Sequence, residues 1–173
     1  MPKFKGIFKY EKIKANVVKN MAGGNADTRQ ERMSEALAMA RYAKSEMKNK
    51  EYGEATADLK AAIRKVRIEG PEDLPFKKEL QKELFKALKK QAKASERYGR
   101  FDDATDLWIE ASECKRSIHQ VTGIYPQSYL NTNILLKRAK RAAAKEYKQS
   151  GNKERYMRRL NQIEEKWTYI RLD

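Results

Sequence analysis

Positively charged side chains recur every three or four residues through the segment 137–159. At that spacing lysine and arginine gather on one side of a helix, where they can bind phosphate groups or an acidic protein surface. Few acidic residues are present to neutralise them, because residues 128–159 hold ten Lys or Arg and only two Glu. We predict that the following residues bind an acidic partner: Lys137, Arg138, Lys140, Arg141, Lys145, Lys148, Arg155, Arg158 and Arg159.

An apolar stripe overlaps the end of this basic patch. Tyr156, Leu160, Ile163, Trp167 and Ile170 are spaced four and three residues apart in turn, which is the spacing of a heptad seam. The stripe covers only about two heptads, which is too short to hold a coiled coil alone. We therefore expect it to dock on another surface, either a partner or the other helices of this chain.

Residue combinations typical of catalysis are missing from the sequence. His119 is the only histidine, and it lies five residues from Cys114, the only cysteine, so a helix would place them on different faces. Carboxylates gather over residues 102–113 without the Glu-x-x-His pairs of a di-metal site, so we expect them at a helix N-terminus and on a solvated face. We predict no enzymatic activity, no cofactor, no metal and no small-molecule substrate.

The net charge of the chain is concentrated near its two ends. The 173 residues include 39 Lys or Arg and 24 Asp or Glu, a net charge of +15. Residues 1–20 carry six Lys and one Glu, while the middle of the chain is nearly balanced. This distribution favours a folded module that lays basic ends on an acidic surface. A single cysteine and the lack of an 18-residue apolar run predict an intracellular protein with no membrane partner.

Composition and turn signals predict an all-α protein. Ala, Glu, Lys, Leu and Arg dominate the sequence, and only four Pro and eight Gly interrupt it. Thr28 and Glu31 have capping-box spacing, which predicts a helix from there to about Lys48. Further helices are expected over 52–68 and 74–97, from an Asp102 cap to about 121, from a Ser128 cap to 149, and from 153 onward. We predict a basic N-terminal arm (1–25), a helical hairpin core (26–123) and basic C-terminal helices (124–173).

An internal repeat lies in the second and fourth of these predicted helices. Residues 52–62 and 101–111 both read aromatic-x-x-Ala-x-x-x-large-x-x-Ala. Over about 36–68 and 85–117 the chain resembles the tetratricopeptide repeat, in which small residues let paired helices approach closely. The copies begin 49 residues apart, at 52 and 101, instead of about 34. The resemblance implies two antiparallel hairpins rather than a tandem superhelix.

A second resemblance lies at the C-terminus. Leu160-Asn161-Gln162-Ile163, followed by Trp167 and by Arg171-Leu172, is similar to the end of a small family of axonemal microtubule inner proteins. Glu164 departs from that family, which tends to have Gly at this position. In the family such segments lie along the lumenal wall of doublet microtubules and contact tubulin and neighbouring filament proteins.

These observations predict a non-enzymatic structural subunit of a large assembly. The C-terminal resemblance implies a microtubule inner protein that binds tubulin in the axoneme of a cilium or flagellum. This is the leading prediction, and the alternative is an accessory protein of a ribosome, above all the mitochondrial one, whose basic termini bind rRNA and ribosomal proteins. A third interpretation is a TPR-like adaptor for a protein partner.

Overall fold

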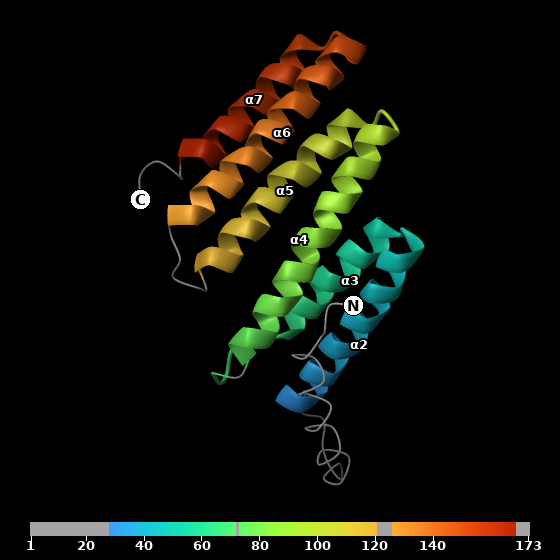
Figure 1. The fold of residues 1–173 in the computed structure, drawn as a ribbon, viewed down its shortest axis with the longest axis vertical. Helices are drawn as coiled ribbons and strands as arrows, with labels where there is room; N and C mark the ends of the chain where they lie inside the picture. Colours follow the sequence, from blue (N-terminus) through green and yellow to red (C-terminus); the bar gives the residue numbers. More distant parts are fainter. Residues whose placement is uncertain (1–27, 72, 121–125, 169–173) are drawn as a thin grey trace.

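The protein is all-helical in the computed structural model, which describes residues 28–71, 73–120 and 126–168, without the side chains of 119, 120, 126–131 and 168. The predicted N-terminal arm lies outside these residues. Figure 1 shows the helices as a row in chain order, from α2 at one end to α7 at the other. Their bounds are α2 Arg29–Asn49, α3 Tyr52–Lys65, α4 Asp73–Arg97, α5 Phe101–Gln120, α6 Pro126–Ser150 and α7 Lys153–Thr168.

Local signals in the sequence set most helix ends. The hydroxyl of Thr28 accepts a hydrogen bond from the Glu31 N–H, and the Glu31 carboxylate accepts one from the Thr28 N–H, so the predicted capping box is confirmed. Gly99 and Gly151 follow α4 and α6 with positive φ angles of 72° and 67°. This left-handed conformation costs glycine little, so the two predicted breaks are confirmed as well.

Three predicted helix ends were wrong. The helix α3 stops at Lys65 rather than 68, because buried Val66 adopts an extended conformation, and the N–H groups of Glu69 and Gly70 then donate to Asp73 of α4. The helix α5 begins at Phe101, so Asp102 lies in its first turn and is not the N-cap. The helix α6 begins at Pro126, two residues before the predicted cap Ser128, as suits a proline at the first helical position.

Each helix packs mainly on its neighbours in sequence. Short connections join α2 to α3 and α4 to α5, which confirms the two predicted antiparallel hairpins (Figure 1). The helices α6 and α7 form a third hairpin, and α6 packs along α5. The predicted C-terminal unit therefore shares its core with the hairpins that precede it.

Two adjoining apolar clusters hold the row of helices together. One fills the space between α2, α3 and α4 and reaches Ala111 of α5, and the other joins α4, α5 and α6 to Ile163 of α7. Phe85 and Leu107 pack against both clusters. Alanine is frequent among the fully buried residues, and its small side chain lets neighbouring helix backbones approach closely.

The residues of the internal repeat lie on the buried faces of α3 and α5. In the two copies the large residue is Leu59 or Trp108, and both side chains are buried together with the alanines on either side of them. The likeness extends to a buried threonine beside the first alanine of each copy. Thr56 and Thr105 each donate a hydrogen bond to the carbonyl of the aromatic residue four positions earlier, at 2.7 Å and 2.9 Å. The repeated residues therefore pack in equivalent ways in the two hairpins.

Candidate functional site

Acidic residues of α5 form ion pairs with basic residues of two other helices, α3 and α7. Glu110 lies 2.5 Å from the Lys60 Nζ of α3, and Glu113 lies 2.5 Å from the Lys166 Nζ of α7. Nearer the start of α5, Asp102 and Asp106 bind arginines of α7. The prediction of a solvated acidic face was therefore incomplete, because these carboxylates join α5 to α3 and α7.

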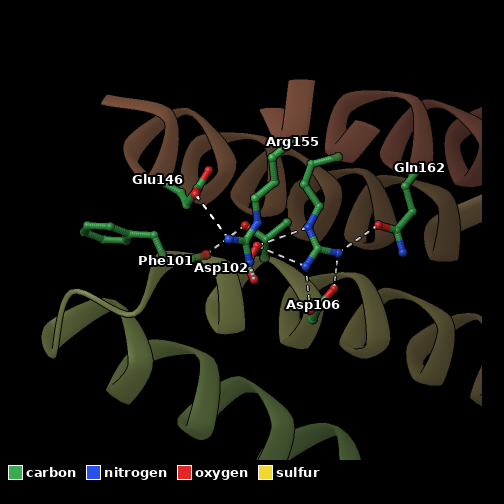
Figure 2. A network of polar contacts seen from close by, with 8 residues as sticks. Phe101, Asp102, Asp106, Glu146, Arg155 and Gln162 are labelled. Atoms are coloured by element: carbon green, nitrogen blue, oxygen red, sulfur yellow. Dashed lines mark hydrogen bonds and ion pairs between the residues drawn. The ribbon is translucent and has the colours of Figure 1, made fainter. Parts of the chain in front are cut away.

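Arg155 and Arg159 are the two arginines of α7 in this network. Figure 2 shows Arg155 reaching from α7 to Asp102, with Glu146 of α6 on its other side. The Arg159 guanidinium donates to Asp102 at 3.0 Å and to Asp106 at 2.8 Å. Burial by itself lowers the pKa of Arg159, but the hydrogen bonds to the two aspartates outweigh it and raise that pKa. The structure thus places Arg155 and Arg159, two members of the predicted basic patch, in ion pairs within the chain.

Other members of the predicted patch form an exposed stripe along α6. Lys137, Arg138, Arg141, Lys145 and Lys148 are all exposed, and apart from the adjacent pair Lys137 and Arg138 they recur three or four residues apart, away from the buried residues of the helix. None of the five forms an ion pair with a carboxylate among the described residues. We call these five residues the α6 stripe.

The two remaining predicted cations lie beside the stripe. Lys140 Nζ lies 3.8 Å from Glu164 of α7. Arg158 pairs with Glu154 one turn earlier on α7, and both side chains are largely exposed. Water screens both contacts, so these two side chains are only weakly held and can still contribute charge to the surface.

Aromatic rings support two cations of the stripe. The Arg138 guanidinium lies 5.1 Å from the ring centre of Trp108, and the Lys145 ammonium lies 5.2 Å from that of Phe101. Both rings belong to α5, and the Trp108 indole N–H donates to Glu96 at 2.8 Å. These contacts orient the charged ends without neutralising them, because an aromatic face attracts a cation but carries no net charge.

Sequence reasoning missed lysines of α4 and α5 that extend the positive surface. Lys89 and Lys115 both lie over the ring of Phe85, at 5.0 Å and 5.3 Å from its centre. Burial lowers the pKa of Lys89, and the positive charges of Lys93, Arg138 and Lys115 lower it further. The sequence held one signal, since Lys89 and Lys93 are one turn apart with no acidic residue between them. The approach of Lys115 and Arg138 depends on the fold alone.

The predicted docking stripe is used largely within the chain. Ile163 is 0% exposed in the cluster formed with α5 and α6, and Trp167 packs against the same cluster. Tyr156 stacks on Tyr147 of α6 with ring centres 5.0 Å apart, and Leu160 is half-buried. Ile170 lies outside the described residues. The sequence left two docking surfaces open for this stripe, a partner or the chain's own helices. In the structure the described residues of the stripe contact the chain's own helices.

Cys114, the single cysteine of the sequence, is partly buried. Burial raises the pKa of the Cys114 thiol to about 12, and its sulfur donates to the Gln81 carbonyl at 3.3 Å. Such a thiol remains protonated and unreactive at neutral pH. Within the described ranges, no group of three or more His, Cys, Asp or Glu residues is placed to hold a metal ion. None of the described helices combines the length and apolar character needed to cross a bilayer.

Comparisons with protein-family models, with curated proteins and with solved structures gave no match. Three features of the structure therefore bear on function. They are the α6 stripe, the lysines of α4 and α5 beside it, and the neutralised acidic face of α5.

Proposed function

We propose that this protein is a non-enzymatic helical scaffold of a large assembly, and that its α6 stripe binds an acidic macromolecule. The observation that carries the proposal is the contrast between two surfaces of the same hairpins. Carboxylates of α5 neutralise Arg155 and Arg159 of α7, whereas the five cations of the α6 stripe have no carboxylate partner among the described residues. Helix surfaces that face only water usually mix both signs of charge.

RNA is the partner that this geometry supports best. The stripe runs from Lys137 to Lys148, which is about 17 Å of helix at 1.5 Å per residue. A row of cations without acidic neighbours matches the repeated phosphates of a nucleic-acid backbone. The apolar side chains that would add a specific protein contact, Ile163 and Trp167, are packed on the chain's own core. The accessory ribosomal protein is therefore our first candidate.

A microtubule inner protein is the second candidate. Its support is the resemblance of residues 160–172, of which Asn161 is exposed on α7 and Leu160 is half-buried. In this candidate the α6 stripe would face the acidic surface of tubulin, because electrostatic steering depends on the sign of charge.

Two variants that each remove two positive charges test the proposal. Lys137→Ala/Arg141→Ala changes the stripe, while Arg155→Ala/Arg159→Ala changes the internal network. RNA affinity would be measured by fluorescence anisotropy with a labelled single strand, from about 50 to 200 mM salt. We expect the stripe variant to reduce the slope of log K against log salt by about 1.4, because each phosphate that is no longer neutralised removes about 0.7. The network variant should keep the wild-type slope.

Equal slopes for the two variants would refute a special role of α6, because both variants change the net charge equally. Cosedimentation with microtubules distinguishes the candidates. Binding to microtubules without binding to RNA would overturn the ribosomal candidate and support the microtubule one.

A further inference from the structure

The junction of α4, α5 and α6 concentrates positive charge around one aromatic ring. Phe85 of α4 is half-buried, and the ammonium groups of Lys89 and Lys115 lie 5.0 Å and 5.3 Å from its ring centre. Lys93 lies one turn after Lys89 on α4. Arg138 of α6 lies over the ring of Trp108, which belongs to the apolar cluster that Phe85 packs against. Three helices thus bring four cations to the surroundings of this cluster, close enough for the other three charges to act on Lys89.

No ion pair relieves this concentration within the described part of the chain. Lys89, Lys93, Lys115 and Arg138 each lack a carboxylate at ion-pair distance there, and the nearby Glu96 accepts the Trp108 indole N–H. Elsewhere on the same helices lysines do have partners, as Lys86 pairs with Glu83 at 2.7 Å. Burial is the main cause of the lowered pKa of Lys89, and the positive charges of Lys93, Arg138 and Lys115 lower that pKa further. A bound anion would offset the repulsion among these cations.

We infer that Lys89, Lys115 and Arg138 form a binding site for a phosphate group at the α4–α5–α6 junction. A phosphate has enough oxygens to accept hydrogen bonds from two ammonium groups and a bidentate bond from a guanidinium. The aromatic rings under these cations limit their movement, so less ordering is needed when the anion binds. The phosphate can belong to a nucleic-acid backbone or to a small phosphorylated molecule, and only the first source rests on the proposed function.

Inorganic phosphate is the probe for this junction site. The full chain, labelled with ¹⁵N, would be titrated with phosphate against chloride at constant ionic strength and followed by NMR. We expect saturable shifts confined to the region of Phe85–Lys93, Lys115 and Arg138. Shifts that fail to saturate, or that spread over all basic surfaces, would overturn the inference.

A matched pair of variants on the full chain sharpens this test. Lys89→Gln/Lys115→Gln should weaken phosphate binding at least tenfold, and its fold is expected to persist because it removes mutual repulsion. Lys82→Gln/Lys86→Gln removes the same charge from lysines that pair with Glu79 and Glu83, and should leave the phosphate affinity within twofold of wild type. Equal phosphate affinity in both variants would refute the junction site.

The same pair separates the two sources of phosphate, with single-stranded RNA as the second probe. If Lys89→Gln/Lys115→Gln weakens RNA and phosphate together, the junction site holds a backbone phosphate. If it weakens phosphate alone, the site takes a small phosphorylated molecule. Wild-type protein that binds phosphate but no RNA would sustain the junction site and overturn the RNA-binding function.

Discussion

Replacing Arg159 by alanine should loosen α7 from α5, because this side chain joins the two helices. Its guanidinium donates to Asp102 at 3.0 Å and 3.2 Å, to Asp106 at 2.8 Å, and to Gln162 on its own helix at 3.0 Å. The Arg159 side chain is only 18% exposed. Its removal would leave Asp106 without its arginine of α7 and Asp102 with Arg155 alone.

The size of this effect follows from the exposure of each carboxylate. Hydrogen bonds to charged groups contribute about 1.5–3 kcal/mol when sheltered, while exposed ion pairs contribute about 0.2–1 kcal/mol. Asp102 is 27% exposed, which places its pair with Arg159 at about 1.5 kcal/mol after allowance for screening. Asp106 is 53% exposed, so its pair contributes about 0.5 kcal/mol. Arg159→Ala should therefore lower the free energy of unfolding by about 2 kcal/mol, or the Tm by about 4–8 °C.

A double-mutant cycle measures the interaction energy between Arg159 and Asp102. Urea unfolding of wild type, Arg159→Ala, Asp102→Ala and the double variant should give an interaction energy of about 1–1.5 kcal/mol. Hydrogen exchange of α7 amides should speed up in Arg159→Ala, because α7 packs chiefly on α6 and the ion pairs to α5 add to that packing. Additivity of the two changes within about 0.3 kcal/mol would refute our interpretation of the network.

Arg158→Ala is the matched control for this experiment. It removes the same charge one residue away, but Arg158 is 76% exposed, and its ion pair among the described residues is with Glu154 on its own helix. We expect it to change the free energy of unfolding by less than about 0.5 kcal/mol. A decrease as large as that of Arg159→Ala would show that net charge, rather than the contact with α5, sets stability.

Two further predictions concern the core and the loop before α4. Ile163→Ala should lower the free energy of unfolding by about 2–4 kcal/mol in chemical denaturation, because the side chain is fully buried. The control Met157→Ala, at an exposed position of α7, should lower it by under about 1 kcal/mol. Equal decreases in the two variants would contradict this packing. Asp73→Ala should cost about 2–4 kcal/mol, because the buried carboxylate accepts bonds from Arg29 and from the N–H groups of Glu69 and Gly70. Burial by itself raises the pKa of Asp73, but these hydrogen bonds outweigh it and lower the pKa from 3.8, so its stabilisation is present above that pH and is lost as the pH falls through the lowered value. Unfolding measured at pH 7 and near pH 3 should therefore differ less in Asp73→Asn than in wild type, and an unchanged pH dependence would contradict this account.

Local features of the sequence were enough to predict the helices. The capping box at Thr28 and the glycines at 99 and 151 act within one helical turn, so no knowledge of the fold was needed. The repeat likewise showed that 52–62 and 101–111 share one residue pattern, and the structure shows its large residues, Leu59 and Trp108, on the buried faces of α3 and α5. Where a helix end depended on a distant contact, as at Val66, the prediction failed.

The sequence by itself determined that residues 137–159 form basic helices, since the charges and their spacing are local properties. Only the tertiary structure decided which of those charges face the solvent. Arg159 and Asp102 are 57 residues apart, yet the packing of α7 beside α5 makes them partners. The packing of α4, α5 and α6 likewise brings Lys89, Lys115 and Arg138 together, so it creates a positive junction that no single stretch of sequence contains. Coulomb interactions depend on distance in space, and the fold sets that distance.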